Sequence, residues 1–198
     1  MKKIKVAITG GIGSGKSSVA AHLQTLGYPV FSCDAIYQTI YPSKEYQAAL
    51  AALFPSCVKD GMVDRKLLAG LVFSDKSALE RLNQLSHASI MDRLNQEMDS
   101  VNANVVFAEV PLLFEGGYES AFDYVIVVLR DRAERIDAIC NRDNLSKEDA
   151  AARIQNQFDY DLAQKNGFFT LPKYLLLKND GDIGLLHKKT EDLLLRIS

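Results

Sequence analysis

The chain carries near its start the run Gly10-Gly11-Ile12-Gly13-Ser14-Gly15-Lys16-Ser17, which matches the pattern G-x-x-x-x-G-K-[ST] at every fixed position. A short β-rich stretch, residues 4–8, precedes the run, and a stretch with one apolar face, residues 16–26, follows it. A strand, a glycine-rich loop and a helix in this order form the context in which such a run binds phosphate. We therefore expect the residues from Gly11 to Ser18 to bind the phosphates of a nucleotide.

The composition of this loop follows from the chemistry of phosphate binding. Glycines permit the positive φ angles that turn successive N–H groups inward and form an anion nest. The helix expected from Lys16 directs its unpaired N–H groups and its positive dipole end at the same anion. Lys16 adds a cation for the β- and γ-phosphate oxygens, and Ser17 offers its hydroxyl to Mg²⁺. The alternative interpretation is a tight glycine turn beside a solvated lysine.

Length and composition exclude several classes of protein. The chain has 198 residues, of which 47% are hydrophobic and 24% charged, as in an ordinary globular domain. A net charge of −2 disfavours a partner such as nucleic acid. Three cysteines without a C-x-x-C pair fit neither a disulfide framework nor a zinc ribbon. No apolar run approaches the ~20 residues of a membrane span, so we expect a cytoplasmic protein without a membrane partner.

Strands and helices alternate along the chain. Besides the two elements that flank the loop, we expect strands at residues 29–31, 104–108, 124–129 and 175–177, and helices at residues 64–73, 75–98, 132–141, 146–163 and 183–195. Nearly continuous apolar strands, such as 104–108 and 124–129, are typical of a parallel sheet that is covered on both faces. The alternation predicts an α/β fold with three layers and leaves the strand order open.

Two carboxylates follow expected strands. Asp34 lies just past residues 29–31, where open α/β sheets bind ligands, and it can accept or orient the proton of an attacking hydroxyl. A helix N-cap for the segment from Ala35 is an equal alternative. Glu109 ends the strand at residues 104–108, a position typical of magnesium binding through water. For Glu109 the alternative is an exposed strand end.

Five arginines fall close together in the second half of the chain: Arg130, Arg132, Arg135, Arg142 and Arg153. Guanidinium groups stabilise the negative charge that phosphoryl transfer spreads over oxygens, but we expect most of the five on a solvated helix face. Arg142, in the loop expected between two helices, is the candidate for a mobile lid. Arg65, at a helix start, can meet an anionic substrate or pair with Asp64. His87, inside a helix, is expected to be packed or half-exposed.

Several motifs in one order along nearly the whole chain resemble the dephospho-CoA kinase family. They are the glycine loop, Asp34, Gly61-Met62-Val63-Asp64-Arg65, Leu82-Asn83 with His87, Pro111-Leu112-Leu113-Phe114-Glu115, Arg142-Asp143, Arg153-Ile154 with Gln157, and Asn179. The resemblance implies a kinase that uses ATP to phosphorylate the ribose 3′-hydroxyl of dephospho-CoA, which gives CoA and ADP in the last step of coenzyme A synthesis. No protein partner is implied.

The resemblance also implies an organisation of the chain. The core is a five-stranded parallel sheet of the nucleoside-monophosphate-kinase type, made of residues of about 1–59, 103–134 and 164–198. A helical substrate-binding insertion covers about residues 60–102, and a lid covers about residues 135–163.

The resemblance implies site residues as well. Asp34, Lys16 and Arg142 match catalytic positions, and Glu109, with Ser17, matches the magnesium side. The substrate-binding positions are Asp34, Arg65 and His87.

Three positions depart from the family's pattern. Ser32 stands where an aspartate is common, Ala88 replaces the proline after His87, and Ala138 replaces a lid arginine for which Arg135 is the candidate substitute.

Two other functions stay open: a kinase for another nucleoside, nucleotide or sugar acid, and an ATP-dependent switch module. A GTP switch is disfavoured because the chain has neither D-x-x-G nor N-K-x-D.

Overall fold

The computed structural model describes residues 2–197 and forms two compact units. The first, here called the sheet unit, contains the described residues up to Phe31 and from Met98 onward. The second, here called the helical unit, is Ser32–Glu97. The helical unit contains most of the insertion expected at residues 60–102 and begins earlier, at Ser32.

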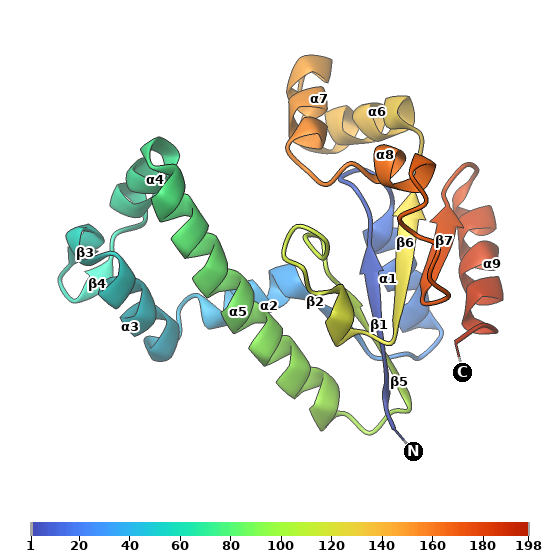
Figure 1. The fold of residues 1–198 in the computed structure, drawn as a ribbon, viewed down its shortest axis with the longest axis horizontal. Helices are drawn as coiled ribbons and strands as arrows, with labels where there is room; N and C mark the ends of the chain where they lie inside the picture. Colours follow the sequence, from blue (N-terminus) through green and yellow to red (C-terminus); the bar gives the residue numbers. More distant parts are fainter. Residues whose placement is uncertain (1, 198) are drawn as a thin grey trace. The chain divides into compact units, whose positions relative to one another are not determined.

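A five-stranded sheet forms the centre of the sheet unit (Figure 1). Its strands are β1 (Ile4–Thr9), β2 (Val30–Ser32), β5 (Val105–Glu109), β6 (Tyr124–Leu129) and β7 (Tyr174–Lys178), in the spatial order β2-β5-β1-β6-β7. β1 pairs in parallel with β5 and β6, and β6 pairs in parallel with β7. The expected α/β fold with a five-stranded parallel sheet is confirmed.

Two helices, α1 (Lys16–Thr25) and α9 (Ile183–Leu194), pack on one face of this sheet and contact each other. Alternate strand residues supply the other side of that core, such as Val6 with Ile8 and Ile126 with Val128, because side chains two positions apart share a face. Ala7, between Val6 and Ile8, is also fully buried. Burial on both faces explains the continuous apolar run that the sequence shows.

Three further helices of the sheet unit are α6 (Arg132–Asp143), α7 (Lys147–Gln155) and α8 (Tyr160–Lys165), and a short 3-10 turn, η2, covers Glu119–Ala121. The single helix expected at residues 146–163 is wrong, because the chain leaves the helix between α7 and α8. There the Phe158 N–H donates to Glu115 Oε1 at 2.9 Å, and Asp159 caps α8. At the break, the side chains of Glu115 and Asp159 replace the backbone acceptors that a continuous helix would provide.

The helical unit has more elements than the sequence pattern predicts. Its elements are α2 (Cys33–Ile40), α3 (Lys44–Leu53), η1 (Pro55–Cys57), the antiparallel pair β3 (Val58–Lys59) and β4 (Met62–Val63), α4 (Arg65–Ser74) and α5 (Lys76–Ser100), of which the last turn enters the sheet unit. Their side chains share a core that includes Tyr46, Leu50, Phe54 and Leu68. Ser32, Ser43 and Asp64 cap the helices, which is the local signal for their starts.

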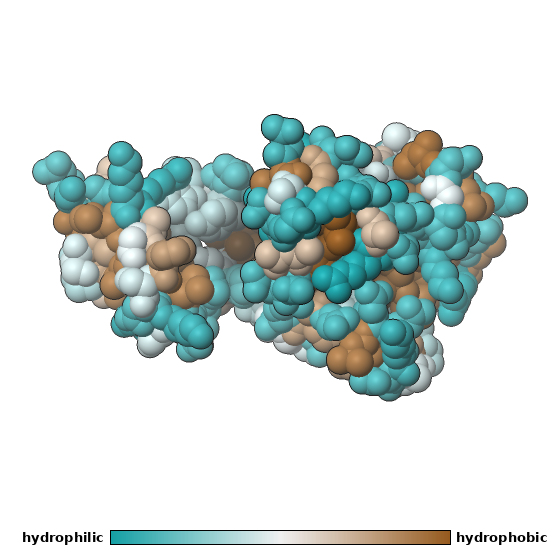
Figure 2. Space-filling view, turned by 90° about the horizontal axis from the view of Figure 1, so that it is seen from above, coloured by the Kyte–Doolittle hydropathy of each residue, from teal (hydrophilic) through white to brown (hydrophobic). Residues whose placement is uncertain are grey.

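Hydrophilic residues cover most of the face that Figure 2 shows, with hydrophobic residues in separate patches. Within residues 2–197, no helix combines the length and the apolar character that crossing a membrane requires.

Candidate active site

The glycine loop joins β1 to α1, and its backbone conformation depends on glycine. Gly13 and Gly15 have φ angles of 78° and 103°, which side chains strongly disfavour. A Cβ at Gly13 would lie 2.7 Å from the carbonyl oxygen of Arg135, and one at Gly15 would lie 2.5 Å from Asn179 Nδ2. Among the described residues, no acceptor bonds the N–H groups of Gly13, Gly15 and Ser17. These amides are therefore available to an anion.

The ammonium group of Lys16 is held against the loop itself. Lys16 is only 9% exposed, and its Nζ donates to the carbonyl oxygens of Gly10 at 2.8 Å and Gly11 at 3.1 Å. The buried cation thus lies beside amides that attract negative charge. This is the arrangement expected for binding phosphate oxygens.

Residues distant in sequence clamp the loop from outside. The Ile12 N–H donates to Gln157 Oε1 at 2.7 Å, and the Ile12 carbonyl accepts from Arg135 Nε at 3.0 Å. Asn179 Nδ2 donates to the Ser14 carbonyl at 2.9 Å. In the sequence, Gln157 and Asn179 stand out only as parts of motifs, and their contacts in the structure give them a role in holding the loop.

Arg135 was expected on a solvated helix face unless it replaces the missing lid arginine, and the structure buries it. Its exposed fraction is 4%, and within the described chain no carboxylate lies within ion-pair distance of its guanidinium. Burial lowers the pKa of the Arg135 guanidinium, and the negative charge of Asp161 opposes that shift. A buried cation without a paired anion is costly, so its position on the phosphate loop is best explained by a ligand that brings negative charge.

A cavity of about 450 Å³ opens beside Arg135. Its lining includes Arg132, Gln157, Tyr160 and Asp161. The Tyr160 hydroxyl lies 3.1 Å from Thr9 Oγ1, and burial raises the pKa of Tyr160 to about 12. Tyr160 therefore stays neutral at physiological pH and contributes no negative charge to the cavity.

Ser17 and Glu109 lie together at the ends of neighbouring elements. Ser17, in the first turn of α1, donates its hydroxyl to Glu109 Oε1 at 2.8 Å, and Glu109 is the last residue of β5. Hydroxyl and carboxylate oxygens are ligands that Mg²⁺ accepts, directly or through water. No group of three or more His, Cys, Asp or Glu residues within residues 2–197 could hold a metal alone. Ser17 and Glu109 therefore fit a metal ion whose other ligands include the phosphates of a bound nucleotide.

Arg142 does not lie in a loop, because α6 continues through Asp143 before Asn144 ends it with a φ of 53°. Its Nε and Nη2 donate to the two carboxylate oxygens of Asp143 at 2.7 and 3.0 Å, and this bonding raises the pKa of Arg142. Arg153 Nη1 also donates to Asp143, at 2.8 Å. Arg142 must leave this carboxylate before it can bind a substrate.

In the helical unit, Asp34 lies in the first turn of α2 and is exposed. The N-cap is Ser32, whose Oγ accepts from the Ala35 N–H, so the alternative of Asp34 as the cap is wrong. Within the described residues, Asp34 has neither a hydrogen bond nor an ion pair. Its carboxylate therefore has no evident structural role.

Arg65 begins α4, and its guanidinium lies 4.0 Å above the centre of the Tyr41 ring. The alternative pairing with Asp64 is not observed, because Asp64 accepts from the backbone of α4 and pairs with Lys59 at 3.2 Å. His87 lies within α5 and is half-buried. The substrate roles of Arg65 and His87 stay predictions.

A phosphate loop at the end of the central strand of a five-stranded parallel sheet defines the class of P-loop kinases. The solved structure of the protein TT1252 from Thermus thermophilus is similar over 100% of both chains, with a TM-score of 0.81 and 35% identity. The structure of dephospho-CoA kinase from Campylobacter jejuni has a TM-score of 0.60 and 25% identity and covers 99% of this chain and 98% of its own.

Sequence comparisons identify the family within that class. A sequence model of the dephospho-CoA kinase family matches residues 4–171. A dephospho-CoA kinase from Thermus thermophilus is 39% identical over 168 residues, which are 85% of this chain and 82% of the relative. The relative from Fusobacterium nucleatum is 30% identical and covers 94% of both chains. The chain belongs to the dephospho-CoA kinase family, as its motifs indicated, and is a phosphotransferase.

Proposed function

We propose that the protein transfers the γ-phosphoryl group of ATP to the ribose 3′-hydroxyl of dephospho-CoA, producing CoA and ADP. The observation that carries the proposal is the loop geometry: the buried Lys16 ammonium and the Ser17–Glu109 pair flank amides that have no acceptor within residues 2–197. Family membership supplies the acceptor, because the relatives are named for it.

The loop residues hold the donor. The amides of the loop and the N-terminus of α1 bind the β- and γ-phosphates, and Lys16 neutralises their charge. Ser17 and Glu109 would hold Mg²⁺, which when bound neutralises charge on the transferring phosphoryl group. Arg135, buried on the loop, adds a second fixed positive charge.

Asp34 acts on the acceptor. Its exposed carboxylate orients the 3′-hydroxyl and takes the proton that the oxygen loses. The oxygen then bonds to the γ-phosphorus while the bond from that phosphorus to the β-phosphate oxygen breaks, and ADP leaves. Because such transition states are loose, positioning and charge contribute more than base strength.

The free state of all three cysteines is typical of proteins from a reducing compartment, which supports a location in the cytoplasm.

The test is ADP release with dephospho-CoA as acceptor, followed by the mass of the product and the position of the new phosphate. We expect ADP release to depend on the acceptor and the product to carry one added phosphate, at the 3′ position. A panel of nucleosides, nucleotides and sugar acids tests for other acceptors. Faster transfer to one of these, or a phosphate at another position, would contradict the proposal, and slow hydrolysis without acceptor dependence would indicate a switch module.

A further inference from the structure

Two arginines and one carboxylate meet where α6 is followed by α7, two helices that contact each other (Figure 1). Asp143, the last residue of α6, accepts from Arg142 through Nε and Nη2 and from Arg153, on α7, through Nη1. The side chain of Asp143 is 23% exposed, whereas those of Arg142 and Arg153 are 59% and 50% exposed. Both arginines therefore stay accessible while they hold a largely covered carboxylate.

The two guanidinium groups converge on Asp143 as they would on a phosphate. A guanidinium binds carboxylate and phosphate groups with the same planar pair of N–H donors, and Arg142 offers that pair to Asp143 at 2.7 and 3.0 Å. The hydrogen bond between them lowers the pKa of Asp143 and raises the pKa of Arg142, so this pair stays charged at neutral pH. Within residues 2–197, no other acidic group pairs with either arginine.

The helix α6 carries Arg142 on the side that meets the phosphate loop. Arg135 donates to the Ile12 carbonyl of that loop, and a Cβ at Gly13 would lie 3.2 Å from Ile139 Cγ1. Arg142 follows Arg135 by seven residues, about two helical turns, and therefore shares this face. At 1.5 Å per residue, the two arginines are about 10 Å apart along the helix axis. The backbone of Arg142 thus lies on the loop side of α6, although its guanidinium is turned to Asp143.

The segment that carries Arg153 also holds the loop. Gln157 follows Arg153 by four residues, and its Oε1 accepts from the Ile12 N–H at 2.7 Å. Ala150, one turn before Arg153 on α7, is fully buried, so this helix is fixed against its neighbours. Both arginines therefore come from segments that contact the phosphate loop at another point.

We infer that Asp143 competes with the terminal phosphate of ATP for Arg142 and Arg153. Its carboxylate holds both guanidinium groups when no nucleotide is bound, and the γ-phosphate displaces it and takes over their N–H donors. ADP lacks this phosphate, so Asp143 recaptures the arginines after transfer and favours release of the product. The inference rests on the proposed function, in which ATP is the donor, and adds the residue that weakens its binding.

The test measures the Kd of ADP and of the imido analogue of ATP, which keeps a γ-phosphate, in the absence of an acceptor. Asp143→Asn keeps the shape of the side chain and removes its charge. Asp137→Asn is the matched control, because Asp137 also lies on α6 and pairs with Lys147 of α7 at 3.3 Å. Each variant loses one negative charge and one contact between the two helices, but only Asp143→Asn releases Arg142.

We expect Asp143→Asn to lower the Kd of the ATP analogue about fivefold and to leave the Kd of ADP within about twofold of the wild type. Fivefold corresponds to about 1 kcal/mol, the upper range for an exposed ion pair, since the Kd falls as the competent state becomes more populated. Asp137→Asn should bind both nucleotides like the wild type.

A second background separates competition from net charge. In a protein that already carries Arg142→Met and Arg153→Met, the further change Asp143→Asn should alter neither Kd, because no guanidinium is left to release. A gain in affinity that persists there, or an equal gain for ADP and the ATP analogue, would reduce the effect to lost negative charge and overturn the inference.

Two other results would also overturn the inference. A higher Kd of the ATP analogue in Asp143→Asn would show that the carboxylate orients the arginines for binding. A lower melting temperature with unchanged Kd values would make Asp143 a structural residue. Because no acceptor is present, the inference stands if another alcohol proves to be the acceptor, and its failure leaves transfer to dephospho-CoA intact.

Discussion

Lys16, Asp34 and Arg135 are positioned by different kinds of interaction. Lys16 is held by carbonyl groups of its own loop, whereas Arg135 reaches that loop from α6. Asp34 is exposed, with no partner in the described chain. Substitutions at these positions should therefore separate effects on catalysis from effects on folding.

Lys16→Ala should lower kcat by roughly 100-fold or more, because it removes a fixed charge from the developing negative oxygens. Steady-state kinetics with dephospho-CoA measures the loss, and circular dichroism checks that the fold is kept. Lys44→Ala, at an exposed position in α3, is the control and should keep wild-type turnover. A kcat within a few-fold of the wild type would remove Lys16 from the mechanism.

Asp34→Asn should lower kcat by roughly 100-fold to 10,000-fold, because an amide cannot take the proton of the 3′-hydroxyl. Its melting temperature should match that of the wild type, since Asp34 has no structural partner within residues 2–197. Glu80→Gln, at an exposed position in α5, tests whether the loss of any acid has the same effect. Near-normal turnover by Asp34→Asn would contradict the assigned role.

Arg135→Met should raise KM for ATP about tenfold and leave the free energy of unfolding without ligand within about 1 kcal/mol of the wild type. The reason is that a buried charge without a paired carboxylate contributes little to stability, so that an apolar side chain of similar size replaces it at small cost, even though the hydrogen bond to the Ile12 carbonyl is lost. Urea unfolding and ATP titration measure the two quantities. A large loss of stability with unchanged ATP binding would make Arg135 a purely structural residue.

Connections between elements decide where several site residues lie. The motif residue Phe114 packs against Phe158 at 4.8 Å and Tyr160 at 5.9 Å between ring centroids. Together with the Glu115 bond to Phe158, these rings fix the segment between α7 and α8. That segment carries Gln157 to the loop.

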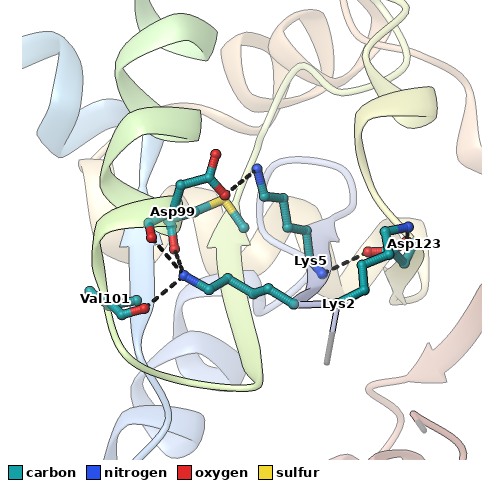
Figure 3. Close-up of polar contacts among 7 residues, drawn as sticks. Lys2, Lys5, Asp99, Val101 and Asp123 are labelled. Atoms are coloured by element: carbon teal, nitrogen blue, oxygen red, sulfur yellow. Dashed lines mark hydrogen bonds and ion pairs between the residues drawn. The ribbon is translucent and has the colours of Figure 1, made fainter.

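The end of α5 is anchored at the start of the chain, by Lys5 in β1 and by Lys3 just before that strand. Figure 3 shows the ion pair between Lys5 and Asp99, of 2.9 Å. Lys3 Nζ donates to the carbonyl oxygens of Met98, Asp99 and Val101 at 2.6, 2.9 and 2.7 Å. A cation there satisfies the unpaired carbonyl groups at the end of a helix.

Lys3→Met should lower the free energy of unfolding by about 1–3 kcal/mol, since it removes charged hydrogen bonds from these carbonyls, and should leave kcat unchanged. Lys2→Met is the matched control, because Lys2 is 84% exposed and pairs with Asp123 at the surface. That change should cost less than about 1 kcal/mol. Urea unfolding of both variants decides, and equal stabilities would show that Lys3 anchors nothing.

At the scale of the whole molecule, the candidate residues divide between the two units. Those for the nucleotide, including Lys16, Ser17 and Glu109, belong to the sheet unit, and those for the acceptor, including Asp34 and Arg65, belong to the helical unit. The roles of the insertion as substrate domain and of residues 135–163 as a lid stay predictions.

This division predicts separable effects of the two ligands on thermal stability. A ligand at 100 times its Kd stabilises the folded state by about 2.7 kcal/mol. Lys16→Ala should lose most of the thermal shift that ATP produces and keep the shift that dephospho-CoA produces. Arg65→Ala, in the helical unit, should show the reverse pattern. Loss of both shifts in either variant would contradict the division.

The sequence by itself determined the phosphate loop, its flanking strand and helix, the parallel sheet and the position of Glu109, because glycine conformation, apolar periodicity and the order along the chain are local properties. Only the tertiary structure decided that Arg135 is buried, that Arg142 pairs with Asp143 and that the segment at Gln157 leaves the helix. Arg135 and Ile12 are 123 residues apart in the chain. Periodicity identifies the polar face of a helix, but it contains no information about which distant segment packs on that face.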